Sequence, residues 1–72
     1  MKNLKFTKEY AGRYTFKFEN KEYVAEKVNY GTGNEWNLLV KNPNETMEYG
    51  YTEEWCNTYG TLKDLKWAVL NN

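Results

Sequence analysis

The chain is predicted to be an α+β protein, an antiparallel β-meander of four or five strands followed by one C-terminal helix packed on one face of the sheet. Three observations support this prediction. Aromatic and polar residues alternate in the first third of the chain, turn-forming residues recur at short intervals, and the hydrophobic period lengthens near the C-terminus. Seventy-two residues leave room for one domain, spanning 1–72.

The clearest strand signal lies at 13–19. Tyr14, Phe16 and Phe18 occupy alternate positions there, so they share one face of a half-buried strand. The segment 22–30 is rich in Val and Tyr and is predicted to be the return strand of a hairpin.

The turn between these strands leaves two registers open. Asn20 suits a positive φ, which a tight hairpin turn requires. A two-residue loop at Asn20-Lys21 pairs Phe18 with Tyr23, whereas a three-residue loop pairs Phe18 with Val24.

A loop is expected at 31–34, where two glycines flank a threonine. The third strand follows, with Trp36, Leu38 and Val40 on one face. The segment 42–45 ends it, because its proline cannot donate a hydrogen bond to a ladder.

Two more strands complete the predicted sheet. Leu4 and Phe6, two positions apart, indicate an amino-terminal strand joined through residues 11–12, and this strand decides between four and five. Alternation resumes at 46–51, which predicts a strand. The residues on one of its sides are Met47, Tyr49 and Tyr51.

The C-terminal helix begins after Thr61, a good N-cap, with Asp64 at the third helical position. Trp67 and Leu70 fall outside its apolar stripe. They either broaden the packed face or form a second contact surface for a dimer or partner. The stripe consists of Leu62, Leu65, Ala68 and Val69.

The composition argues against catalysis. Histidine and serine are absent, so serine triads and Cys–His pairs are impossible within the chain. Cys56 is the one cysteine, which excludes an internal disulfide, and the usual zinc ligand sets are missing. Glu53 and Glu54 are adjacent, so on a strand they point to opposite faces. We predict a protein that is not an enzyme and holds no cofactor or metal.

No segment predicts a membrane anchor or a secretion signal. The amino terminus lacks an apolar core of the signal-peptide kind. The longest apolar runs, 38–40 and 67–70, are far too short to span a bilayer. A lone cysteine also fits a reducing compartment, so the predicted location is cytoplasmic.

Charge is unevenly distributed although the formal net charge is zero. Residues 1–30 carry seven bases and four acids, whereas residues 31–72 carry three bases and six acids. This pattern indicates either a solvated dipolar surface or an acidic face that binds a basic partner. Aromatic side chains in the acidic region are candidate anchors. The predicted partner-binding residues are Glu45, Glu48, Tyr49, Tyr51, Glu53, Glu54 and Trp55.

The segments 12–18 and 60–65 carry a resemblance to the arm-binding amino-terminal domains of some tyrosine integrases. Those domains insert a three-stranded sheet into the major groove of DNA, so the resemblance implies an alternative function in nucleic-acid binding. Zero net charge and the glutamates at 45–54 depart from that pattern. The residues that it would place in the groove are Arg13, Thr15, Lys17 and Lys27.

In size and in its abundance of Asn, Lys and Tyr, the chain also resembles small proteins encoded by phages and prophages of low-GC bacteria, among them anti-CRISPR proteins. The resemblance implies a phage or mobile-element regulator that inhibits a host protein by binding it. We therefore predict a small protein-binding module. A structural or self-assembling phage component, active as a homo-oligomer, is a further alternative.

Overall fold

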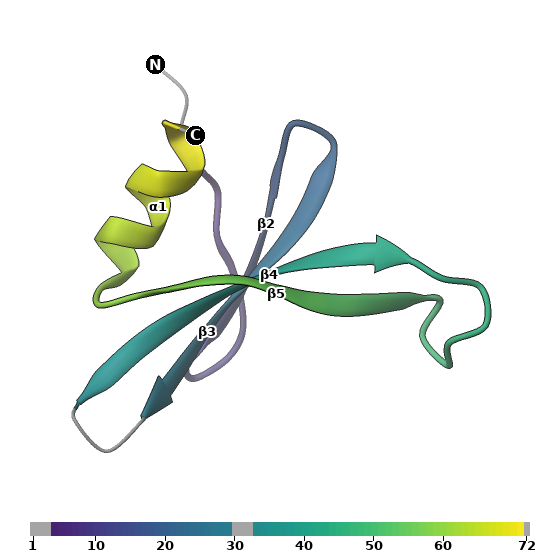
Figure 1. Cartoon of the computed structure of the whole chain (residues 1–72), viewed down its shortest axis with the longest axis horizontal. Helices are drawn as coiled ribbons and strands as arrows, with labels where there is room; N and C mark the ends of the chain where they lie inside the picture. The colour runs from purple at the N-terminus through teal and green to yellow at the C-terminus, as the bar shows by residue number, and fades with distance from the viewer. Residues whose placement is uncertain (1–3, 30–32, 72) are drawn as a thin grey trace.

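The computed structural model describes residues 4–29 and 33–71. Within these residues, five strands form one antiparallel sheet in the order β1-β2-β3-β4-β5, and a single helix follows (Figure 1), as the α+β prediction requires. The strands are strongly twisted, and the β4–β5 hairpin extends away from α1. The elements are β1 (Thr7–Tyr10), β2 (Arg13–Phe18), β3 (Lys21–Asn29), β4 (Asn34–Pro43), β5 (Tyr51–Tyr59) and α1 (Leu62–Leu70).

The β2–β3 hairpin has neither of the two registers predicted from the sequence. Phe18 pairs with Lys21 and Phe16 with Tyr23, so the turn residues are Glu19 and Asn20. Both have positive φ, 51° and 66°, which is the requirement of a type I′ turn. The turn therefore begins one residue earlier than expected, and Glu19, a residue type that seldom adopts positive φ, occupies its first central position.

The predicted amino-terminal strand exists, but different residues form it. β1 follows Leu4 and Phe6, which instead pack against the core from outside the sheet. The rings of Phe6 and Phe16 stack with centroids 4.6 Å apart. The segment before β1 therefore lies against the core, where Phe6 covers Phe16. Pairing with β2 begins only at Thr7.

The core lies between α1 and one face of the sheet. Alternation places Phe16, Ala25 and Leu38 on that face in three neighbouring strands, and Leu65 and Val69 of the helix close over them. The sequence-based assignment of the helix stripe and of the aromatic strand face is confirmed. We call this the helix face, and the opposite surface of the sheet the open face.

The helix begins as predicted. The Thr61 side chain accepts a hydrogen bond from the Asp64 backbone N–H at 3.1 Å. This bond satisfies one of the amide donors that the first turn of a helix leaves without an intrahelical partner.

The prediction of a strand at 46–51 is wrong. Residues 44–50 form the turn of the β4–β5 hairpin, and β5 begins at Tyr51. Asn44 explains the difference, because its Oδ1 accepts from the backbone N–H and the hydroxyl of Thr46 at 3.1 and 2.7 Å. Gly50, with φ 77°, then closes the turn: its carbonyl oxygen accepts a hydrogen bond from the Asn44 backbone N–H.

Sequence analysis also missed most of β5. Its residues show no simple alternation, since the register shifts between Leu38, which pairs with Asn57, and Leu39, which pairs with Trp55. Cys56 is the extra residue of this β-bulge, and it reverses the period-two pattern at that point. β5 is also an edge strand with side chains mostly exposed or half-buried, so burial leaves little apolar signal.

Candidate functional site

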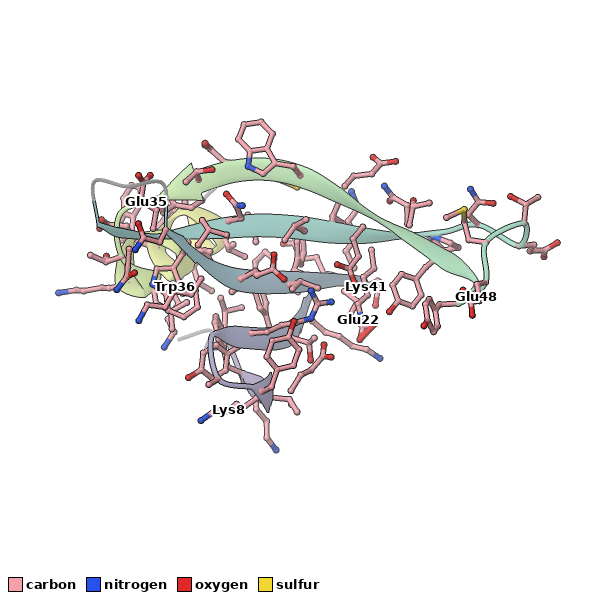
Figure 2. The ribbon with its side chains drawn as sticks, turned by 90° about the horizontal axis from the view of Figure 1, so that it is seen from below. Lys8, Glu22, Glu35, Trp36, Lys41 and Glu48 are labelled. Carbon is pink, nitrogen blue, oxygen red and sulfur yellow. The ribbon has the colours of Figure 1, made fainter. Side chains whose placement is uncertain are left out.

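Among the described residues, those of the β4–β5 turn extend farthest from the helix (Figure 1). Figure 2 shows Glu48 at one end of the molecule, with Glu35 and Trp36 at the other. We call residues 44–50 the hairpin tip. Backbone bonds within it, from Met47 N–H to Asn44 O and from Gly50 N–H to Met47 O, give it a defined conformation.

Exposed apolar side chains are concentrated on this hairpin. Tyr49 is 76% exposed, and Met47 and Trp55 are also exposed. Among the described residues, the other large apolar side chains with comparable exposure are Tyr10 and Trp67, which lie on β1 and α1. Large apolar side chains gathered on one projecting element indicate a contact surface, because each is costly to leave in water.

The predicted partner-binding residues do not form one continuous surface. Glu45, Glu48 and Tyr49 lie together on the tip, and no ion pair joins either glutamate to another described residue. Tyr51, Glu53 and Trp55 lie on the open face of β5, whereas Glu54 pairs with Val40 and points to the helix face. The divergence of Glu53 and Glu54 agrees with the sequence-based expectation.

Glu53 is bound within the chain. Arg13 bonds through Nη2 to the Glu53 carboxylate, through Nη1 to Glu26 at 3.0 Å, and through Nε to Glu9 at 3.4 Å. Only 12% of the Arg13 side chain is exposed. The hydrogen bond to Glu53 raises the pKa of Arg13 above its ordinary value, and Glu26 adds to this effect while burial opposes it.

The Arg13–Glu53 pair shows how strongly the sheet coils. Three strand spacings, roughly 14 Å in a flat sheet, separate β2 from β5. The register increases this separation. Arg13 pairs with Glu26 of β3, whereas Glu53 pairs with Lys41, which in turn pairs with Glu22 of β3. Four residues of strand add roughly 13 Å. The two side chains therefore meet only because twist folds the open face into a concave surface.

The same coiling accounts for the burial of Val24. It is fully buried although it lies on the open face, in the row between Thr15 and Leu39. The Arg13–Glu53 pair crosses the sheet along the diagonal that passes this row. The open face thus has a buried apolar residue near its centre, close to the diagonal along which Arg13 and Glu53 meet.

Trp55 is exposed but its orientation is fixed. Its indole Nε1–H donates to Thr58 Oγ1 at 3.0 Å and to Asn37 Oδ1 at 3.3 Å. The Thr58 hydroxyl is in turn within 2.6 Å of the same Asn37 oxygen. An aromatic ring held in this way loses little side-chain entropy when a partner covers it.

The alternative nucleic-acid contacts are divided between the two faces. Arg13, Thr15 and Lys17 lie on the open face, as alternation predicts, but Lys27 pairs with Trp36 on the helix face. Arg13 is neutralised by glutamates, as described above. The four residues therefore do not present one cationic surface to a groove.

Sequence analysis did not identify the basic concavity beside the tip. Two hollows share Glu22 as a lining residue: one lies on the open face toward β1, and the other lies at the end of the sheet between the β2–β3 turn and the base of the β4–β5 hairpin, where Lys21 and Asn42 come from the helix face. We call them together the lysine trough, because Lys5 and Lys17 line the first and Lys21 and Lys41 the second. No local sequence pattern predicts this site, because its lysines come from three strands and from the segment before β1.

Cys56 does not have the environment of a reactive thiol. Burial raises its pKa, Glu54 adds to the rise, and Lys21 opposes it. Its Sγ lies 3.8 Å from the Glu54 carbonyl oxygen. A raised pKa leaves less thiolate at neutral pH, and the thiolate is the nucleophilic form.

Within residues 4–29 and 33–71, no three acidic, cysteine or histidine side chains are grouped so that they could hold a metal ion. The same ranges contain no helix that is long and apolar enough to cross a membrane. Comparisons with protein-family models, with characterised proteins and with solved structures find no match for this chain.

Proposed function

We propose that the chain is a protein-binding module and that the β4–β5 hairpin carries its contact surface. The concentration of exposed apolar side chains on the hairpin is the observation that carries the proposal. Tyr49 at the tip and Trp55 on the open face of β5 are the expected anchors, since Tyr and Trp dominate the binding energy of many interfaces.

The charges of the tip favour a partner with basic residues beside an apolar contact. Glu45 and Glu48 are exposed, whereas Glu53 is already bound by Arg13. We therefore assign Glu53 to the support of the open face and keep the two tip glutamates as contacts. Acidic residues at the rim of an interface accelerate association with a basic partner and exclude acidic ones.

The proposed partner is a host protein. The chain would be its regulator or inhibitor, of phage or mobile-element origin, and would act by binding without turnover. Composition supports the origin, and the position of the anchors supports the mode of action. The divided basic residues make nucleic-acid binding the weaker alternative.

Affinity capture from a lysate of the native host tests the proposal. The wild-type chain is compared with a Glu48→Lys/Tyr49→Ala variant and with Trp67→Ala, which removes an aromatic side chain that is 68% exposed on α1. Capture of the same protein by wild type and Trp67→Ala, but not by the hairpin variant, supports the proposal. Capture that disappears after nuclease treatment would contradict it and favour the nucleic-acid alternative.

A further inference from the structure

The lysine trough is a large and positively charged concavity. Its two hollows have volumes of about 350 and about 340 Å³. Four lysines line them, and Glu22 is the one acidic residue among the described residues that do so. Figure 2 shows Glu22 and Lys41 side by side, and Lys41 Nζ lies 3.8 Å from Glu22 Oε1 and 4.7 Å from the centre of the Tyr51 ring.

The tip has the opposite character. Met47 and Tyr49 are exposed apolar side chains, and Glu45 and Glu48 provide negative charge without a basic residue between positions 45 and 54. Tyr49 is the most exposed of the large apolar side chains in the described part of the chain. A cavity of about 150 Å³ is enough for a benzene molecule, so either hollow has room for a phenol ring.

Tip and trough adjoin each other. Gly50, the last residue of the tip, and Tyr51, the first of β5, line the second hollow, and the rings of Tyr49 and Tyr51 lie 6.4 Å apart. A surface that carries two complementary patches side by side can pair with itself around a two-fold axis, because each copy then offers its tip to the trough of the other.

We infer that two copies of this chain associate through this surface, with the hairpin tip of each copy seated in the lysine trough of the other. Tyr49 enters a hollow and stacks near Tyr51, while Glu48 lies among the lysines. The inference stands on the complementarity of tip and trough. It is independent of the proposed host partner, which would compete for the same tip.

The association is expected to be weak, since a contact made by one turn and one trough covers less area than a standard interface. Sedimentation velocity of the wild-type chain, over roughly a hundredfold range of concentration reaching about 1 mM, should show a shift from monomer to dimer. Added salt should weaken the dimer, because exposed charges are screened beyond about 10 Å at 0.1 M ionic strength. A chain that remains monomeric throughout this range, at low salt, overturns the inference and leaves the proposed function standing.

A charge exchange tests the geometry. Lys17 and Glu48 are exposed, so Lys17→Glu and Glu48→Lys should each raise the dimer Kd at least about tenfold without unfolding the domain. The double variant should recover at least part of the loss. Glu35→Lys, at the opposite end of the sheet, makes the same change in net charge as Glu48→Lys and should leave the Kd unchanged.

Tyr49→Ala provides a second measurement that does not depend on charge. It should raise the Kd by roughly thirtyfold, the effect of losing an anchor at an interface. Dimers that tolerate Tyr49→Ala, or a double variant that associates no better than its two parents, would contradict the arrangement. Loss of the dimer in Glu35→Lys as well would show a response to net charge alone and would also contradict it.

Discussion

The β2–β3 and β4–β5 hairpins both join neighbouring antiparallel strands, but they use their side chains in opposite ways. The first closes in two residues, and its strands place Phe16 and Ala25 in the core. The second needs seven residues, and its tip leaves Tyr49 in water. The comparison separates side chains that build the domain from side chains that are free to bind.

The two hairpins also differ in how they are held. α1 packs on the helix face, where Phe16 and Ala25 of the first hairpin and Leu38 of the second meet it, and its closest strands are β4 and β5. β4 also pairs with β3 along its length, whereas the tip of the second hairpin lies beyond the last paired residues, Pro43 and Tyr51. Substitutions in the body should therefore lower stability, whereas substitutions at the tip should change binding alone.

The largest effect on stability is expected from Leu65→Ala. Leu65 is fully buried between the helix and the sheet, so the cavity should lower the free energy of unfolding by about 2–5 kcal/mol. Trp67→Ala, on the outer side of the same helix, removes a larger side chain but should cost less than about 1 kcal/mol. Chemical denaturation measures both, and equal losses would refute the assignment of the helix faces.

The next largest effect should follow Arg13→Met. Three glutamates lose their shared cation, and we expect a loss of about 1–3 kcal/mol. Lys8→Met removes the same charge from an exposed site on β1 that has no ion pair among the described residues, and it should stay within about 0.5 kcal/mol of wild type. A loss of equal size in the two variants would mean that net charge, rather than the bridge, stabilises the open face.

The turn of the first hairpin should show a smaller effect. Asn20 has φ 66°, so Asn20→Ala should cost about 1 kcal/mol, because a Cβ without a polar group disfavours the left-handed region. Asn20→Gly should keep or raise the stability. Denaturation midpoints compare the three chains. If alanine proved as stable as glycine there, the assigned turn would be wrong.

Cys56 should change reactivity more than stability. Since its pKa is raised, its alkylation by iodoacetamide should be slower at neutral pH than that of an unstructured thiol, with a midpoint at higher pH. The raised value also means that the unfolded thiol ionises first, so its small contribution to stability is complete below the ordinary pKa of 9.0 and lost as the pH rises through the folded value. Faster alkylation than the reference thiol would contradict the described environment.

Sequence patterns predicted the parts of the fold whose side chains alternate between a buried and an exposed side. Tyr14, Phe16 and Phe18 marked β2, and Leu65 and Val69 marked the packed face of α1. The patterns failed where packing does not set the period. Met47 and Tyr49 alternate within a turn, because the Asn44 side chain directs the backbone there.

The candidate site was predictable in composition but not in geometry. The acidic and aromatic character of 45–55 is visible in the sequence. That Arg13 would bind Glu53 is not, since the pair joins residues 40 positions apart and depends on the coiling of the whole sheet. The lysine trough was missed for the same reason.

The central claim, that the β4–β5 hairpin carries the contact surface, is tested most directly at its tip, by photo-crosslinking in the native host. A photoreactive phenylalanine derivative replaces Tyr49 in one chain and Trp67 in another, both being exposed aromatic positions. The account predicts a covalent adduct with a host protein from position 49 and none from position 67. Adducts from position 67 alone, or from position 49 to nucleic acid only, would contradict it.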